Sequence, residues 1–187
     1  MITRYQIQLR GNMQVTTDDQ ANWIRVSAPL PQELQTLATT YGLPATYLAA
    51  ATDQHENARV EGLNPADQVP GLIVLRYPVE TTSETGFDQY NTVPMTMILL
   101  NDRVITITHD PLQAFDDLAQ QKLSPKPEEF ALEVLWLVLH QFVIAMDKLN
   151  DETKQIERSL GKAAKNTQLY QLMAMQKGLV FFDAALD

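Results

Sequence analysis

The sequence predicts an α/β protein in which a mixed β-sheet is sandwiched by helices and followed by a long antiparallel helical hairpin. Over the first two thirds of the chain, short runs of alternating or continuous apolar residues intersperse with helical patterns. After Pro127 the apolar residues recur in steps of three and four, which indicates a long helix with one packed face. A second stripe of this kind follows a break at residues 161–166, so the two helices should pack antiparallel.

Alternation and turn residues place the strands. Tyr5, Ile7 and Leu9 fall on one face of an alternating segment. Asn101 and Asp102 form a two-residue connection of the kind that closes a hairpin. The Thr- and Ser-rich residues 78–86 are expected to form an exposed loop. The expected strands are residues 2–9, 23–26, 72–75, 95–100 and 103–108.

Proline and glycine place the short helices. Pro31 is expected to start one helix that Gly42 ends, and Pro44 to start another. Asp110 is expected to cap a further helix that has Pro111 at its first position. The two stripes of the hairpin comprise Leu132, Leu135, Leu139, Phe142, Met146, Leu149, Thr153, Ile156 and Leu160, and then Leu172, Met175, Leu179, Phe182 and Leu186.

These patterns divide the chain into an α/β sheet domain, residues 1–123, and a helical hairpin, residues 124–187. The apolar pattern of the second helix still continues at Asp187, so we expect this helix to be cut short. The most apolar stretch, residues 134–146, is interrupted by His140 and Gln141. It is shorter than the roughly 20 apolar residues of a membrane helix, and the N-terminus has no signal-peptide core. The chain is therefore expected to be soluble.

Composition excludes several classes of function. The formal net charge is −9, whereas a nucleic-acid-binding protein needs a basic face to displace counterions from phosphate. The sequence contains no cysteine, which excludes disulfides, thiolate zinc sites and cysteine nucleophiles. A hydrophobic content of 45% is ordinary for a globular protein, so a packed core is expected.

No residue is predicted to carry catalysis, to bind a cofactor or to hold a metal, and we expect no enzymatic activity. The three histidines, His55, His109 and His140, are isolated, and no glycine-rich phosphate loop occurs. Adjacent carboxylates could bind magnesium weakly, but each pair is better explained as a solvated surface or as the first turn of a helix. These pairs are Asp18–Asp19, Asp116–Asp117, Glu128–Glu129 and Asp151–Glu152.

Short motifs recur in a fixed order along the chain. They are Trp23-Ile24, Glu33-Leu34, Tyr41-Gly42-Leu43, Ala58-Arg59-Val60-Glu61, Tyr90-Asn91-Thr92-Val93-Pro94, Val104-Ile105-Thr106-Ile107, Asn166, Leu169 and Gln176-Lys177-Gly178-Leu179-Val180-Phe181-Phe182. In this order they are similar to the cytoplasmic domain of the CorA family of magnesium and divalent-cation transporters. Ala58 replaces the proline of the family's proline-basic-x-glutamate signature, and Gly178 and Phe181 depart from its lysine-serine-leucine-valine-tyrosine-phenylalanine run.

This resemblance implies the cytoplasmic regulatory domain of a bacterial CorA-like channel at the cytoplasmic face of the cell membrane. It implies that a stalk helix, two membrane helices and a Gly-Met-Asn pore signature follow in a pentameric full-length protein. The fragment alone is expected to be a monomer or a weak oligomer, to lack the pore, and to contact the membrane only through those later helices. No cofactor is expected to be tightly bound, and magnesium is the expected transported and regulatory ion, with cobalt, nickel and zinc as alternatives.

The resemblance also implies a regulatory acidic pair that follows a leucine before the basic-x-glutamate signature. Alignment on Leu48 and on Arg59 places Ala49 and Ala50 at that position, and alanine does not coordinate a cation. The nearest acids are Asp53, Glu56 and Glu61. We therefore expect no specific magnesium binding by this chain below the millimolar range.

Two other classes of function remain possible from the sequence. The first is a stand-alone cytoplasmic interaction module whose helical hairpin binds a partner. The second is a hydrolase that uses acidic residues, which would need a cleft with convergent polar groups.

Overall fold

The computed structural model describes residues 1–8, 13–64, 69–160 and 166–187. Leu9 of the first expected strand and most of the expected break at residues 161–166 lie outside this range. The elements are β1 (Ile2–Ile7), β2 (Met13–Val15), a 3-10 helix η1 (Asp18–Gln20), β3 (Trp23–Ser27), α1 (Pro31–Tyr41), α2 (Ala45–Thr52), β4 (Arg59–Glu61), β5 (Gly71–Thr82), β6 (Asp88–Leu99), β7 (Val104–Thr108), α3 (Gln113–Leu118), α4 (Pro127–Leu160) and α5 (Asn166–Leu186).

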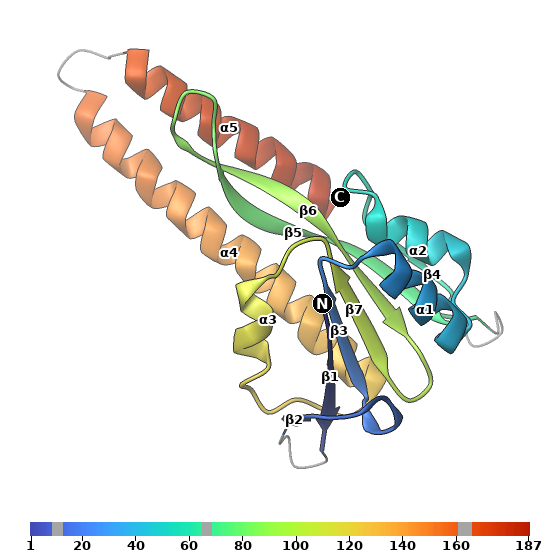
Figure 1. The fold of residues 1–187 in the computed structure, drawn as a ribbon. Helices are drawn as coiled ribbons and strands as arrows, with labels where there is room; N and C mark the ends of the chain where they lie inside the picture. The colour runs from blue at the N-terminus through green and yellow to red at the C-terminus, as the bar shows by residue number, and fades with distance from the viewer. Residues whose placement is uncertain (9–12, 65–68, 161–165) are drawn as a thin grey trace. The chain divides into compact units, whose positions relative to one another are not determined.

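The strands form a seven-stranded mixed sheet in the order β2-β1-β3-β7-β6-β5-β4 (Figure 1). At its centre β3 and β7 pair in parallel, with Ile24 opposite Ile105 and Val26 opposite Ile107. The expected hairpin at Asn101 is confirmed, because β6 and β7 pair antiparallel from Leu99 opposite Val104. The mixed sheet with its helices confirms the predicted fold class.

The chain comprises two compact units, which share three elements. The first unit contains Met1–Leu75 and Pro94–Leu137, and the second contains Arg76–Val93 and Val138–Asp187. The units therefore divide the chain within β5, β6 and α4. The domain boundary expected between residues 123 and 124 stays a prediction.

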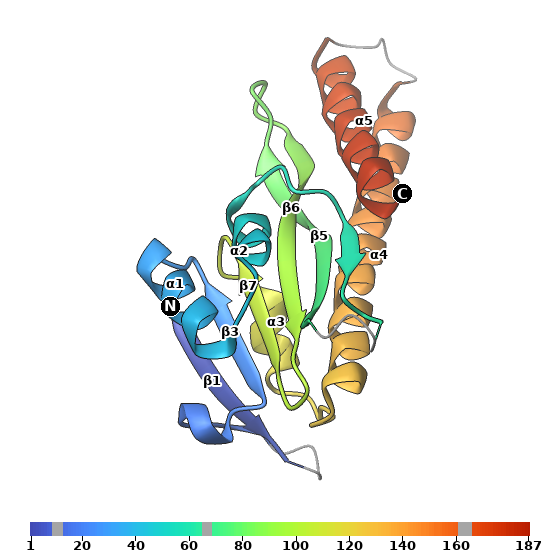
Figure 2. The same cartoon turned by 90° about the vertical axis from the view of Figure 1, so that its right-hand side faces the viewer.

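In the first unit, α1 and α2 cover one face of the strands (Figure 2). Gly42 ends α1 with φ 62°, a left-handed conformation that glycine adopts without steric cost. On β3 the side chains of Ile24 and Val26 point into this core, in agreement with the period of two along a strand. The other buried residues of the core are Ala21, Leu34, Leu37, Leu43, Tyr47, Ala50, Leu72, Val74, Ile98, Ile105 and Ile107.

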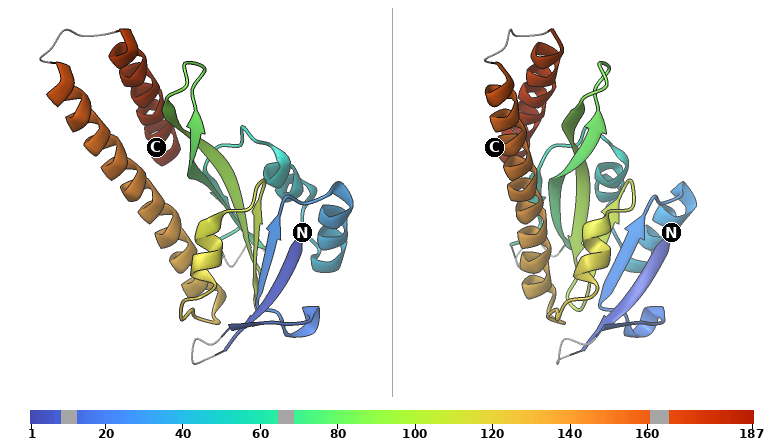
Figure 3. Two further views of the ribbon diagram at one scale, coloured as in Figure 1. Left: turned by 60° about the vertical axis from the view of Figure 1, so that its left-hand side comes forward. Right: turned by 90° about the vertical axis from the view of Figure 1, so that its left-hand side faces the viewer.

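Trp23 organises the opposite face of β3, which α3 and the first turns of α4 cover (Figure 3). Its indole is fully buried, with ring centroids 6.0 Å from Phe115 of α3 and 5.1 Å from Phe130 of α4. Tyr5 of β1 stacks on it at 4.7 Å. The indole N–H donates to the Thr106 hydroxyl of β7 at 3.0 Å, so its polar atom is satisfied without water.

Arg25 shares this face of β3 with Trp23, and it determines where α3 begins. Its guanidinium forms an ion pair with Asp116, donates to the Leu112 carbonyl at 3.2 Å and lies over the Phe115 ring. The predicted helix start at Asp110 and Pro111 is wrong, because α3 begins at Gln113 after an extended Leu112. The contact of the Leu112 carbonyl with Arg25 is tertiary and leaves no signal in the local sequence.

The structure also corrects the loop expected at residues 78–86. Strand β5 continues to Thr82, and the turn occupies the following residues, with Gly86 at φ 80°. Pro78 was expected to bound the strand, and a proline has no N–H to donate to a neighbouring strand. β4 pairs only with Leu72–Val74, so β5 is an edge strand at Pro78, where a missing donor is tolerated.

In the second unit, α5 returns antiparallel to α4, which confirms the predicted hairpin (Figure 1). Gly178 brings α5 against β6, since a Cβ built there would lie 3.2 Å from the Tyr90 Cβ atom. Phe182 lies one helical turn after Gly178. Its ring centroid is 5.4 Å from that of Tyr90 and 5.2 Å from that of Phe142. The departure from the family run at Gly178 therefore has a packing role.

The predicted stripes of the hairpin are only half correct. Phe142, Leu149 and Ile156 of α4 are buried, as are Met175 and Phe182 of α5. The intervening members of the two stripes are exposed: Leu132, Leu139, Met146, Leu172, Leu179 and Leu186 are between 37% and 65% accessible. In their place α4 buries Val134, Val138 and Ala145, and α5 buries Ala174 and Gly178.

Among the described residues, one helix has the length and apolar character of a membrane span. It is Pro127–Arg158 of α4, with a mean hydropathy of 1.6 over its most apolar window and 39% of that window buried. The expectation that this stretch is too short to span was based on residues 134–146, and the helix is longer. Length and composition alone are weak evidence, because core helices of soluble proteins have the same properties.

Replacing Trp23 with alanine is expected to lower the free energy of unfolding by about 3–5 kcal/mol, since the cavity would separate four packed elements. Trp136→Ala is the matched control, because the Trp136 side chain is 72% exposed and its loss should cost less than about 1 kcal/mol. Urea unfolding followed by far-ultraviolet circular dichroism measures both. Equal losses in the two variants would contradict the role of Trp23.

Candidate functional site

Ala49 and Ala50, where the resemblance led us to expect an acidic pair, lie on α2 and have different surroundings. Ala50 is 1% exposed and belongs to the core under α1 and α2. Ala49 is exposed and lines a hollow of about 240 Å³ with Leu34 and Thr52, whose lining residues carry no charge. Only Ala49 therefore presents a side chain to solvent, and the hollow has no carboxylate for a cation.

The acids considered as substitutes are held by other groups. Arg59 of β4 forms an ion pair with Glu56 and bonds the Glu61 carboxylate from its Nε at 2.6 Å. This hydrogen bond to Glu61 raises the pKa of Arg59, so the guanidinium stays charged. Asp53 accepts the backbone N–H of His55 at 2.8 Å. The basic-x-glutamate signature thus forms an internal ion network, in which one guanidinium bonds two carboxylates.

The other sequence candidates are dispersed over the surface. Asp116 pairs with Arg25, Glu129 with Lys126 and Asp151 with Lys154. Asp19 is exposed on η1, and the side chain of Asp18 lies outside the described part of the chain. The three histidines are exposed, with His109 near the Gln54 amide at 2.7 Å. Within the described residues, no group of three or more metal-ligating side chains converges.

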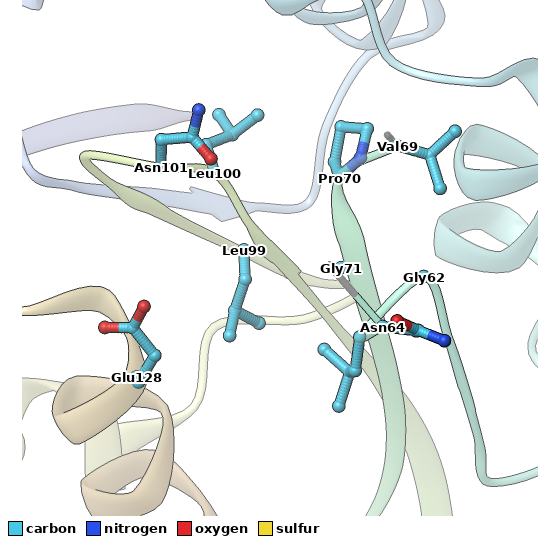
Figure 4. Close-up of a pocket in the computed structure, with 10 residues that line it drawn as sticks. Gly62, Asn64, Val69, Pro70, Gly71, Leu99, Leu100, Asn101 and Glu128 are labelled. Carbon is cyan, nitrogen blue, oxygen red and sulfur yellow. The ribbon is translucent and has the colours of Figure 1, made fainter. Parts of the chain in front are cut away.

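A pocket of about 570 Å³ in the first unit is lined by the end of the β6–β7 hairpin, the start of β5 and the first turn of α4 (Figure 4). Gly62 allows its wall to close, because a Cβ there would lie 2.6 Å from the Pro70 carbonyl oxygen. Its polar groups are Glu128, Asn64 and Asn101, and Glu128 and Asn64 lie on opposite sides (Figure 4). Among the described lining residues Glu128 is the only acid, and none is a histidine, serine or lysine.

A charged cluster links β5, β6 and α4 within the second unit. Lys148 of α4 contacts Glu80 of β5 at 2.5 Å, and this hydrogen bond raises the pKa of Lys148. Burial raises the pKa of Glu152, Lys148 opposes that shift, and Asp88 and Glu80 add to it. The cluster therefore has more carboxylates than cations, and Glu152 is the one whose ionisation costs free energy in the folded protein.

Comparison with known proteins places this arrangement in a family. The family model described as CorA-like Mg2+ transporter protein matches residues 18–186, which include the sheet and both long helices. The chain belongs to the CorA family. This confirms the resemblance found in the sequence. The comparison with curated proteins finds no match.

Solved CorA-like structures share the fold. The complete structure of the CorA magnesium transporter from Methanocaldococcus jannaschii has 20% identity and a TM-score of 0.80, and the match covers 100% of this chain and 59% of that one. The soluble domain of the same transporter has 20% identity and a TM-score of 0.78, with coverage of 100% and 74%. The ZntB cytoplasmic domain from Vibrio parahaemolyticus has 12% identity, a TM-score of 0.70 and coverage of 97% and 72%. The chain thus spans about three fifths of the length of the complete CorA structure.

The burial of Ala50 leads to a test of the acidic-pair position in this CorA-family chain. Ala50→Asp is expected to lower the free energy of unfolding by about 3 kcal/mol or more, because it places a carboxylate in an apolar core. Ala49→Asp makes the same chemical change at an exposed position and should cost no more than about 1 kcal/mol. Thermal unfolding of both variants distinguishes them, and comparable losses would show that Ala50 is not enclosed.

The raised pKa of Glu152 leads to a pH-dependent effect. A carboxyl whose pKa is higher in the folded state stabilises the fold when protonated, and this contribution is lost as pH rises through the folded pKa. Glu152→Gln should therefore be more stable than the parent at pH 7, by less than about 1 kcal/mol, and the advantage should shrink as the pH falls toward 4.

Glu80→Gln is the contrasting variant, since it removes the partner of Lys148 and should lower stability at pH 7. Urea unfolding between pH 4 and pH 8 measures all three proteins. A Glu152→Gln variant that is less stable than the parent at pH 7 would contradict the assignment.

Proposed function

We propose that the chain is the cytoplasmic regulatory domain of a CorA-like transporter of magnesium or another divalent cation. The observation that carries this proposal is the family match over residues 18–186, which spans the sheet and the hairpin together. The fold agrees with it, because the whole chain superimposes on the soluble domain of a CorA protein. In this proposal the pore lies in a part of the protein that follows the sheet and the hairpin, and the full-length protein is a pentamer in the cell membrane.

In this role, cation sensing would not use the family's acidic pair. Ala49 has no ligand atom, Ala50 is buried, and Glu56 and Glu61 are both bonded to Arg59. A weak response through diffuse negative charge is the remaining route, since the chain has a net charge of −9. Such attraction is screened by salt and has no defined stoichiometry.

The complete reading frame provides the first test. We expect two apolar spans with a Gly-Met-Asn sequence after the segment described here, and expression of that full-length protein should restore growth of cells that lack magnesium uptake. A stop codon directly after residue 187 would contradict the transporter and favour a stand-alone module.

Titration calorimetry of the 187-residue chain provides the second test. Magnesium chloride should give no saturable heat below the millimolar range, and light scattering should show a monomer or a weak, concentration-dependent oligomer. A one-to-one isotherm at micromolar magnesium that persists in raised potassium chloride would overturn the proposed absence of a site.

A stand-alone interaction module is a second candidate function, and one observation favours it. The hairpin exposes half of both predicted stripes, including Met146 of α4 and Leu179 of α5, each 48% accessible. Exposed apolar rows of this kind mark surfaces that bind other proteins.

A further inference from the structure

In the second unit, the end of β5, the following turn and the start of β6 form a narrow two-stranded element, residues 79–90, which we call the ribbon. Its turn is closed by a hydrogen bond from the Ser83 N–H to the Phe87 carbonyl at 2.8 Å. The Thr81 hydroxyl donates to the Gln89 carbonyl across the two strands at 3.1 Å. Because these bonds are internal to the ribbon, they hold its shape whether or not it rests on a helix.

The ribbon rests on the two long helices through an aromatic contact and an ion pair (Figure 1). Tyr90 packs on Phe182 of α5 and lies against the backbone of the same helix at Gly178. Lys148 of α4 pairs with Glu80 at 2.5 Å. Apolar packing of rings does not change with pH, whereas an attraction between charges does. The ionic contact is therefore the part of this attachment that the solution can alter.

Two further carboxylates act on this ion pair. Lys148 and Glu152 are four residues apart, so they share one face of α4. Lys148 favours the ionised form of Glu152, whereas Asp88 of β6 and Glu80 of β5 oppose it. The same four charged groups act on the hydroxyl of Tyr90, so they gather around the buried ring that joins the ribbon to α5. The contact thus combines one ammonium with three carboxylates from three elements.

The excess of carboxylates gives the contact an unusual response to acid. Burial raises the pKa of Glu152, and the charges of Asp88 and Glu80 add to this effect. A carboxyl whose pKa is higher while the ribbon is attached favours attachment when protonated, and this contribution is lost as pH rises through that pKa. The hydrogen bond to Glu80 raises the pKa of Lys148, so its ammonium stays charged over the same range. Attachment should therefore strengthen on mild acidification, whereas an isolated surface ion pair weakens when its carboxylate is protonated.

We propose that Lys148 and Glu152 of α4, with the two carboxylates of the ribbon that face them, form a proton-sensitive latch that holds the ribbon on the hairpin more firmly in mild acid than at neutral pH. On α5 the ammonium of Lys177 lies over an aromatic ring of the same helix, so the charges of the latch come from α4 and the two strands. The proposal does not depend on cation transport, and its failure leaves the transporter proposal standing.

The absence of cysteine from the sequence allows a single introduced thiol to report attachment. Ala174 of α5 lies one turn before Gly178, is 5% exposed and lines a hollow of about 220 Å³ together with Gln89 and the turn of the ribbon. Ala174→Cys therefore places a thiol that is enclosed while the ribbon is attached. Val180→Cys places the reference thiol at a position that is 59% exposed, which corrects for the effect of pH on thiol reactivity.

The rate of reaction with a dipyridyl disulfide is measured for both proteins at pH 7.5 and at pH 5.5. We expect the ratio of the Ala174→Cys rate to the Val180→Cys rate to fall about threefold at the lower pH, because local opening of the ribbon becomes rarer. When Glu152→Gln is added to both proteins, the ratio should already be low at pH 7.5 and should stay constant. Far-ultraviolet circular dichroism verifies that each variant remains folded.

Two further variants separate the latch from general effects of charge. Glu157→Gln makes the same chemical change at an exposed position of α4 outside the latch, and it should keep the threefold response of the parent. Lys148→Met removes the ammonium and keeps an unbranched side chain, and it should raise the ratio at pH 7.5 above that of the parent, because the carboxylates then repel one another without a cation between them.

Three results would overturn the proposal. The first is a ratio in the parent that does not change between the two pH values, and the second is an equal effect of Glu152→Gln and Glu157→Gln. The third is a Lys148→Met protein with the ratio of the parent at pH 7.5, which would show that the ion pair does not hold the ribbon.

Discussion

The burial of Trp23 is the constraint on which the rest of the first unit depends. Its indole contacts rings from β1, α3 and α4 and hydrogen-bonds a hydroxyl of β7, so one side chain joins four elements that are far apart in the sequence. The next residue of β3 on the same face is Arg25. Its guanidinium is buried and has Asp116 and the Leu112 carbonyl as partners. An apolar ring and a paired charge on one strand face together set where α3 begins and where α4 passes.

The even positions of β3 impose a second, independent requirement. Ile24 and Val26 are fully buried and lie opposite Ile105 and Ile107 of the parallel strand β7. Because both faces of this central parallel pair are covered, a buried polar side chain on it needs a hydrogen-bond partner. Each buried hydroxyl or guanidinium on β3 and β7 has such a partner. The helical layer on this face includes α2, and this explains why Ala50 is enclosed while Ala49 is exposed.

On the same helix lies the position where the resemblance led us to expect an acidic pair. Ala49 is exposed there and has an apolar side chain, and Ala50 belongs to the core. Nearby, Arg59 supplies a permanent positive charge to two carboxylates. Both carboxylates are bonded to one guanidinium, so a cation that bound them would have to compete with a positive group of the same chain.

The sequence by itself determined the alternating strands, the β6–β7 hairpin, the glycine end of α1 and the existence of two long antiparallel helices. These features depend on local periodicity and turn chemistry, which are contained within a few neighbouring residues. The residues that carry the family resemblance, such as Trp23 and Arg59, were also apparent from the sequence.

The tertiary structure alone decided that β5 continues through Pro78, because the strand becomes an edge only when β4 stops. It also decided which half of each heptad stripe is buried, since Leu139 and Phe142, or Leu179 and Phe182, are equally apolar in sequence. Only the approach of Gly178 to Tyr90 and the contact between α4 and α5 distinguish them, because burial is a property of the neighbours that surround a side chain and not of the side chain alone.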